Sequence, residues 1–301
     1  MDLLQLRHFQ AVARHEHVSR AAAELRVAQP ALSRSIARLE AELGVPLLRR
    51  HGRRVALNRF GASFLTRVDA ALRELDQGRQ ELADAAGLAR GSVAVAVETL
   101  RTVTSLTAGF LAEHPDASLR LYQSPAPQMA AQLQAGTVDL CLASQPLTGA
   151  GLRSAELVRE EVLLGVPPAH PLAARGSVAV EVLAGEPVVT TRPGYWQRAL
   201  TDELFARAHI RPVIACEGDE PYAIRELISA GVGIGLLPAL ARRVTAQPPV
   251  GWLHLDAPGC RRTLSAVWRE DAYLSAAARA FRDFAASHFR RWPDGGAAAA
   301  G

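Results

Sequence analysis

Hydrophobic residues near the start of the chain recur at the spacing of α-helices. One helix is predicted by a stripe of four residues, Leu32, Ile36, Leu39 and Leu43. Pro30 suits the first turn of that helix, and Gly44 suits the left-handed residue that often ends one. Before it, the alanines at 21–23 predict a shorter helix with Ser19 as its N-cap, and small side chains let two helices approach closely. The stretch is therefore typical of a helix-turn-helix, whose second helix enters the major groove of DNA.

The same patterning predicts a wing beside these two helices. Residues 3–14 carry leucine, phenylalanine and valine on one side of an opening helix. Residues 47–57 are predicted to form two short strands, with Gly52 at the turn and arginines on both sides of it. A wing of this charge would lie along a phosphate backbone or enter a minor groove. Residues 1–60 are thus predicted to be a winged helix-turn-helix domain.

A long linker helix is predicted from residue 61 to about residue 88. Its apolar residues follow a heptad repeat, in which Arg79 is the polar exception. The apolar positions are Leu65, Val68, Leu72, Leu75, Leu82 and Ala86, and the first five are the expected dimer contacts. A heptad sustained over three repeats favours a coiled coil, so we expect these side chains to join two copies of the chain in a dimer. The alternative is a helix that packs on its own domain.

Beyond residue 91 the pattern changes to strands that alternate with helices. Apolar runs predict strands at 93–97, 119–123, 138–143, 161–166, 188–190, 212–217 and 262–269, and helices at 102–114, 128–134, 196–209, 222–230 and 273–290. This alternation predicts an α/β fold with a largely parallel sheet. Two such cycles predict two lobes around a cleft, lobe I at about 91–161 and 264–292 and lobe II at about 162–263. The tail at 293–301 has low complexity and is expected to be disordered.

Charge distinguishes the two ends of the chain. Residues 1–60 carry 11 arginines and 5 acidic residues, a net charge of +6, whereas the other 241 residues carry 23 arginines and 25 acidic residues, a net charge of −2. The chain contains no lysine, so every cationic contact to a phosphate would come from arginine, whose planar guanidinium suits phosphates and guanine edges. The basic N-terminal domain therefore indicates nucleic acid or an anionic surface as a partner.

Several function classes lack their usual sequence signals. The chain has no HExxH, no GxSxG and no lysine for a Walker motif, so neither a catalytic nor a metal site is expected. Cys141, Cys216 and Cys260 form no CxxC pair, and neither a secretory signal nor an apolar run of membrane-spanning length is present. These features predict a cytoplasmic protein. A cytoplasmic small-molecule-binding protein of solute-binding fold and a cysteine-based redox regulator remain as alternatives.

The N-terminal motif resembles that of LysR-type transcriptional regulators. It comprises Leu6-Arg7-His8-Phe9, Ala11-Val12-Ala13, Arg20-Ala21-Ala22, Val27-Ala28-Gln29-Pro30-Ala31-Leu32-Ser33, Leu39-Glu40 and Leu43-Gly44. The family usually has phenylalanine where Leu48 stands and a threonine-proline pair near Asn58. The resemblance extends over essentially the whole chain, and segments 17–25 and 216–238 are most similar to the glutamate-synthase-regulator branch.

This resemblance implies a winged helix-turn-helix, a linker helix and a periplasmic-binding-protein-like effector domain, commonly assembled as a homotetramer, a dimer of dimers. The implied partners are a dyad operator in double-stranded DNA and further copies of the chain, and RNA polymerase is an additional candidate. No membrane partner is expected, and no cofactor is expected besides a small-molecule effector.

Contacts to base edges are expected at the N-terminus of the second helix. Gln29 can offer a bidentate amide to adenine, and Pro30 and Ala31 can touch a thymine methyl group. The full set of expected DNA contacts is Ser19, Arg20, Gln29, Pro30, Ala31, Ser33, Arg34, Arg38, Arg50, Arg53 and Arg54. The last three are expected to hold phosphates without regard to sequence. For Gln29, the alternative is a capping role without base contact.

The effector is expected in the cleft, at strand ends and helix N-termini, where anions are favoured. The resemblance places effector contacts at the same turns. The expected residues are Thr99, Leu100, Arg101, Thr102, Ser144, Gln145, Thr190, Thr191, Arg192, Glu217 and Gly233. Threonine hydroxyls could hold carboxylate oxygens and the arginines could supply charge, so a small anionic metabolite is predicted. The alternatives are plain N-caps for the threonines, solvated arginines, and close packing for the glycine-rich segment 231–238.

Overall fold

The structure is a computed structural model that describes residues 1–51, 54–85, 91–243 and 248–290. The chain divides into two compact units, residues 1–89 and residues 90–301. The predicted turn at Gly52, the end of the linker helix beyond residue 85 and the low-complexity tail lie outside the described residues.

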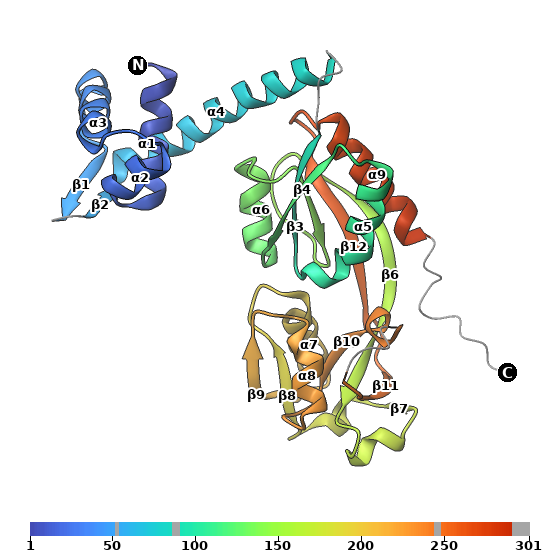
Figure 1. The fold of residues 1–301 in the computed structure, drawn as a ribbon. Helices are drawn as coiled ribbons and strands as arrows, with labels where there is room; N and C mark the ends of the chain where they lie inside the picture. Colours follow the sequence, from blue (N-terminus) through green and yellow to red (C-terminus); the bar gives the residue numbers. More distant parts are fainter. Residues whose placement is uncertain (52–53, 86–90, 244–247, 291–301) are drawn as a thin grey trace. The chain divides into compact units, whose positions relative to one another are not determined.

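The first unit is a winged helix-turn-helix followed by a long helix (Figure 1). Its elements are α1 (Leu3–His15), α2 (Val18–Glu24), α3 (Gln29–Leu43), β1 (Leu48–His51), β2 (Arg54–Leu57) and α4 (Arg59–Ala85). Strands β1 and β2 pair in antiparallel fashion and form the wing. The predicted stripe of α3 is buried at Leu32, Ile36 and Leu39, against Phe9 of α1 and the close-packed alanines of α2.

The predicted C-terminus of α3 is confirmed, but the predicted N-cap of α2 is not. Gly44 ends α3 in the left-handed region with φ of 71°, as predicted. The prediction that Ser19 caps α2 is wrong, because His17 is the N-cap and offers no side-chain hydrogen bond. Ser19 lies in the first turn of the helix with its side chain exposed.

Two polar side chains and one glycine hold the wing against the helices. The Glu40 carboxylate accepts hydrogen bonds from the backbone N–H groups of Leu47 and Leu48, at 2.7 and 3.1 Å. Asn58 donates to the carbonyl oxygen of Pro46, and its own side-chain oxygen accepts from the first turn of α4. Gly61 packs so closely that an added Cβ would lie 2.1 Å from the Leu47 carbonyl oxygen.

The heptad of α4 divides into two halves. Val68 and Leu72 are buried in the first unit's own core, and Leu65 packs against that core. Leu75 and Leu82 are exposed, at 45% and 73%. The first half of the repeat therefore packs on its own domain, as the alternative interpretation held. Among the heptad residues that the structure describes, the exposed apolar side chains available to another copy are Leu75 and Leu82.

The second unit is a two-lobed α/β domain built around an eight-stranded mixed sheet and a separate parallel pair of strands in lobe II. Lobe I contains β3 (Ser92–Val97), the 3-10 helix η1 (Leu100–Val103), α5 (Thr104–Glu113), β4 (Ser118–Gln123), α6 (Ala126–Gln134), β5 (Leu140–Ala143) and α9 (Ala276–Arg290). Lobe II contains η2 (Pro171–Ala174), β7 (Ser177–Val178), η3 (Val180–Leu183), β8 (Pro187–Thr191), α7 (Trp196–Arg207), β9 (Val213–Gly218), α8 (Ala223–Ser229), β10 (Gly235–Pro238), η4 (Ala239–Arg243) and β11 (Gly251–Leu255). Strands β6 (Leu152–Val166) and β12 (Arg261–Arg269) run through both lobes (Figure 1).

Separate hydrophobic clusters stabilise the lobes. In lobe I, α5 and α9 cover one face of the sheet and α6 covers the other. In lobe II, α7 and α8 pack over the short strands. Burial passes from the lobe I cluster to the lobe II cluster between Val158 and Val162 on β6, and between Leu264 on β12 and Cys260 just before that strand. The two crossing strands therefore form the hinge region that underlies the cleft.

The sheet is less parallel than the sequence pattern suggested. Strands β4, β3 and β5 are parallel, but β12, β6, β10 and β11 are joined by antiparallel pairs. The first nine residues of β6 were missed because LRSAELVRE is rich in polar residues and more than half of them are exposed. In lobe I this strand pairs on one side with β12, and an edge strand tolerates charged residues.

Candidate DNA-contacting surface and effector cleft

The expected DNA contacts of the helix-turn-helix lie on its solvent side. Gln29, Pro30, Ala31 and Arg34 are exposed at the N-terminal part of α3, and Ser33 is partly exposed. Arg38 lies one turn further along the same exposed face of α3. The side chains of Ser19 and Arg20 are exposed at the start of α2. The Gln29 amide nitrogen lies 3.5 Å from the Ser33 hydroxyl, so the amide remains largely available to an outside partner.

The wing arginines are placed only in part. Arg50 lies on β1 and Arg54 on β2, and Arg54 is the register partner of His51. Arg53 lies outside the described residues, and the side chains of Arg50 and Arg54 are not described either. Their contact with phosphates therefore remains a prediction.

The cleft of the second unit contains two sizeable cavities that share Trp196 and Arg262. The first, which we call the α5-side cavity, has a volume of about 450 Å³. Lobe I contributes Thr99, Arg101, Thr102, Thr104, Ser105 and Ala108 to its lining; lobe II and the hinge contribute Trp196, Gln197, Pro221, Tyr222, Arg225, Leu237, Pro238, Leu240, Ala241 and Arg262. This size suits a metabolite, and the lining combines aromatic and aliphatic walls with a few polar groups, as in small-molecule sites.

Two arginines give the α5-side cavity a positive charge. The guanidinium of Arg101 lies 4.1 Å from the ring centre of Tyr222. Arg225 donates to the carbonyl oxygens of Pro248 and Ala241 and stacks over Trp252. Burial lowers the pKa of Arg225, and the positive charge of Arg101 acts in the same direction. An anion in the cavity would relieve this repulsion.

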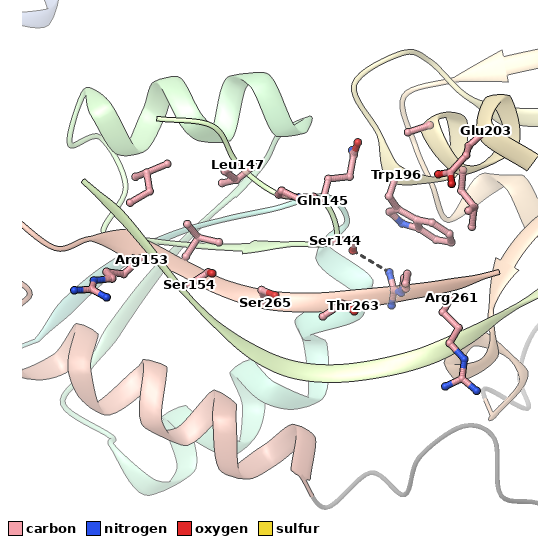
Figure 2. Close-up of a pocket in the computed structure, with 16 residues that line it drawn as sticks. Ser144, Gln145, Leu147, Arg153, Ser154, Trp196, Glu203, Arg261, Thr263 and Ser265 are labelled. Atoms are coloured by element: carbon pink, nitrogen blue, oxygen red, sulfur yellow. Dashed lines mark hydrogen bonds between the residues drawn. The ribbon is translucent and has the colours of Figure 1, made fainter. Parts of the chain in front are cut away.

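The second cavity, the β12-side cavity, has a volume of about 520 Å³ and a more polar lining. Figure 2 shows Ser144 and Gln145 from the turn after β5, Thr263 and Ser265 from β12, and Trp196 and Glu203 on the side of α7. Gln145 also donates from its amide nitrogen to the Gly194 carbonyl oxygen at 3.1 Å, which links the two lobes. This side of the cleft thus offers hydroxyl and amide groups beside an apolar surface.

A buried ion pair forms the wall between the cavities. Arg262 on β12 donates to Glu160 on β6 over 2.7 Å, and both side chains are at most 5% exposed. The other Glu160 oxygen accepts from the backbone N–H of Leu240 at 2.7 Å. The Arg262 guanidinium lies 5.1 Å from the Trp196 ring centre. The pair therefore joins both crossing strands, η4 and α7 at the hinge.

A second buried carboxyl group lies close to this pair. Glu98 follows β3 and is only 4% exposed, and one of its oxygens has no hydrogen-bond partner among the described residues. Burial raises the pKa of Glu98, while Ser144, Arg262 and Gln145 lower it by smaller amounts. The protonated, neutral form of the Glu98 carboxyl is therefore more favoured than it would be in an exposed glutamate. A small cavity of about 10 Å³, room for about one water molecule, adjoins Glu98 and Arg262.

The structure brings together only part of the expected effector set. Thr99, Arg101 and Thr102 line the α5-side cavity, and Ser144 and Gln145 line the β12-side cavity. Within the part of the chain that is described, the remaining candidates line none of the three cavities: Leu100, Thr190, Thr191, Arg192, Glu217 and Gly233.

Each of these six residues has another environment. Leu100 is exposed, and the hydroxyls of Thr190 and Thr191 are buried. Arg192 pairs with Asp219 at 2.6 Å, and Glu217 pairs with Arg198 at 2.8 Å. An added Cβ at Gly233 would lie 2.3 Å from the Pro187 carbonyl oxygen, so this glycine allows close packing, the alternative considered for the segment.

Several lining residues were not predicted from the sequence. Trp196 and Gln197 begin α7, Tyr222 and Arg225 flank the start of α8, and Arg262 lies on a crossing strand. One local signal was available for Arg225, because it lies between the apolar Ile224 and Ile228 on the buried side of a short helix. A charged residue in such a position calls for a specific partner.

The cysteines offer little support for a redox site. Cys141 and Cys260 are buried free thiols, and burial raises the pKa of each to about 12. A thiol in this state is a poor nucleophile, because the thiolate is the reactive form. Cys216 is partly exposed on β9. Separately, none of the described helices is both long enough and apolar enough to cross a membrane.

Comparison with known proteins agrees with this division of the chain. Residues 3–62 match the helix-turn-helix family described as "Bacterial regulatory helix-turn-helix protein, lysR family", and residues 86–290 match the "LysR substrate binding domain". The HTH-type transcriptional regulator YybE of Bacillus subtilis (strain 168) is 37% identical over 292 residues, which cover 96% of this chain and 99% of that protein. The transcriptional dual regulator GltC of the same organism is 30% identical over 295 residues, 97% of this chain and 98% of that protein.

The fold also matches solved structures. CbnR, a LysR family transcriptional regulator, aligns with a TM-score of 0.69 at 23% identity, over 97% of this chain and 99% of that chain, and it has also been solved with its target DNA. The resemblance noted in the sequence is confirmed. The chain belongs to the LysR family of transcriptional regulators, with a helix-turn-helix DNA-binding domain at its N-terminus and a C-terminal domain for a small-molecule effector.

Proposed function

We propose that this regulator binds a dyad operator as a dimer of dimers, and that a small anion in the α5-side cavity controls it. It acts by binding rather than by catalysis, in the cytoplasm where the operator lies, and RNA polymerase is the candidate partner at the promoter. The observation that carries the proposal is that Arg101 and Arg225 line one cavity between the lobes together with two of the predicted threonines, Thr99 and Thr102.

The cavity lining supports an anionic effector on chemical grounds. Thr99 and Thr102 flank the start of η1, and hydroxyl groups there can donate to an acid. Arg101 and Arg225 supply positive charge from opposite lobes. An acid bound between them would contact both lobes at once, so its affinity would depend on how the lobes are arranged. Such differential affinity is what a ligand needs in order to shift a conformational equilibrium.

Calorimetry on the full chain tests this proposal. The panel contains organic acids, aromatic acids and matched neutral amides, with 2-oxoglutarate and glutamate among the first compounds to try. We expect an acid to bind and its amide to bind at least about tenfold more weakly, a difference of about 1.4 kcal/mol. Arg101→Gln should lower the affinity for the acid and leave the affinity for the amide unchanged. Tight binding of a neutral compound that is indifferent to Arg101 would contradict an anionic effector.

We predict that Gln29→Ala lowers affinity for the cognate operator by about tenfold or more, because a bidentate contact to a base is worth about 1–3 kcal/mol. The exposed amide at the start of α3 motivates the test. Gel shifts on cognate and scrambled duplexes at one salt concentration measure it, and the scrambled duplex serves as the control. Equal losses on both duplexes would assign Gln29 to phosphate contact or to helix stability instead.

We predict that Leu75→Glu with Leu82→Glu disrupts dimers and operator binding together. These side chains are the exposed part of the α4 heptad, and two charges in an apolar seam oppose helix pairing. Leu72 is unsuitable for this test because it is buried in the protomer's own core. Sedimentation velocity reports the assembly, and Ala71→Glu, also exposed on α4 but outside the apolar a and d positions, is the control. An intact dimer in the double variant would place the interface elsewhere.

A further inference from the structure

One loop of lobe II reaches across the cleft and contacts lobe I. The loop joins β9 to α8 and carries two adjacent acids with different partners. Asp219 turns back within lobe II and pairs with Arg192 at 2.6 Å. Glu220 instead receives hydrogen bonds from two lobe I residues, Thr99 and Gln123.

The Glu220 carboxylate is held by donors from both lobes. Oε2 accepts from the Gln123 amide nitrogen at 2.9 Å, and Oε1 accepts from the Thr99 hydroxyl at 3.4 Å. The backbone N–H of Tyr222 donates to Oε1 at 3.0 Å. Gln123 also approaches the Asp219 carbonyl oxygen at 3.4 Å. The two oxygens of the Glu220 carboxylate thus accept from two different parts of lobe I. Thr99 follows β3, and Gln123 is the last residue of β4.

This carboxylate adjoins the cavity proposed for the effector. Thr99 both lines the α5-side cavity and donates to Glu220. Tyr222, whose backbone holds the same carboxylate, lines the cavity beneath the Arg101 guanidinium. The position of Thr99 at a helix start predicted that it would hold a carboxylate of the effector. In the structure a carboxylate of the protein itself is bound there.

We propose that Glu220 is an internal substitute for the effector's carboxylate: an effector acid takes over Thr99 and Gln123, and the loop that carries Glu220 is released from lobe I. The inference rests on the proposed function, that the cleft binds an anion, and narrows that anion to a carboxylate. It also gives the ligand a way to change the contact between lobes without touching the helix-turn-helix.

The strength of the contact suits a displaceable group. Glu220 is exposed, and exposed charged contacts stabilise a structure only weakly. A tethered group nevertheless competes with a free ligand through its effective concentration, which is in the millimolar range for short flexible tethers. Removing Glu220 should therefore improve the apparent affinity for a free carboxylate by about fivefold.

Acetate added to the Glu220→Ala full-length chain tests the proposal directly, because acetate reproduces the removed group. The readout is the thermal unfolding midpoint against sodium acetate, with sodium chloride added to keep ionic strength constant. We expect a saturable rise whose half-saturation is about fivefold lower than in the wild type. Glu226→Ala, an exposed acid on α8 outside the contact, should behave as the wild type. Gln123→Leu in the Glu220→Ala background should remove the response.

Equal acetate responses in Glu220→Ala and the wild type would overturn the proposal, as would a response that persists without Gln123. Glu220→Gln is the second variant, since it keeps the side-chain shape and should give an intermediate response. The outcome is separable from the test of the proposed function. An acid that binds the wild type and Glu220→Ala equally would support an anionic effector and refute the substitute role. An acetate response in Glu220→Ala, with no acid of the panel that binds the wild type, would show that Thr99 and Gln123 can hold a carboxylate and would refute an anionic effector.

Discussion

Arg262→Leu is expected to lower the free energy of unfolding of the second unit by about 3–5 kcal/mol. The substitution leaves Glu160 charged, 1% exposed and without its guanidinium partner. Because η4 also depends on that carboxylate through the Leu240 N–H, the loss should extend to the lining of the α5-side cavity. Urea unfolding followed by circular dichroism, fitted for the second transition, measures the effect.

Two further variants separate the buried charge from other causes. Arg262→Leu combined with Glu160→Gln should recover more than half of the loss, because glutamine still accepts from Leu240 and carries no charge. Arg159→Leu removes an exposed ion pair with Glu156 on β6, the strand that also carries Glu160. It should lower the free energy of unfolding by less than about 1 kcal/mol. If Arg262→Leu unfolds like Arg159→Leu, the buried pair does not hold the hinge together.

Gly61→Ala should destabilise the first unit by about 2–3 kcal/mol and abolish operator binding. An added Cβ would lie 2.1 Å from the Leu47 carbonyl oxygen and 2.9 Å from a Leu57 methyl carbon. The chain must move at the point where the wing strands meet α4, which shifts the wing relative to α3. Thermal unfolding and gel shifts on one preparation measure both effects.

Gly78→Ala is the matched control, because Gly78 lies on the same helix with no atom within 4 Å of an added Cβ. It should stabilise the helix by up to about 1 kcal/mol, since alanine is the better helix former. Wild-type stability and operator affinity in Gly61→Ala would show that the wing can move without cost.

The first unit was largely predictable because its signals are local. The α3 stripe, Pro30 and Gly44 lie within one helix length, and the left-handed Gly44 ends the helix as expected. The failure at Ser19 is also local, since a serine one or two residues past the true N-cap has the same composition signal. The α4 heptad was ambiguous for a physical reason. The same spacing buries Leu72 in the core of its own domain and leaves Leu75 exposed.

The cleft was only partly predictable because distant segments meet there. Thr99, Thr102 and Ser144 were found because strand ends and helix starts mark a cleft in any two-lobed α/β fold. The pair of Arg262 with Glu160 spans 102 residues and lies on strands whose pairing no local pattern specifies. Arg192 had the same local signal as Arg101, but Asp219 pairs with it. Only the three-dimensional structure distinguishes these two arginines.

One DNA-binding titration tests the central claim, that the second unit controls operator binding by the first through a bound acid. The full chain is titrated onto its dyad operator with and without a saturating concentration of the acid that calorimetry identifies, followed by footprinting. The account predicts a changed footprint or affinity with the acid, no change with its neutral amide, and loss of the effect in Arg101→Gln. Identical isotherms and footprints with and without a saturating acid would contradict it.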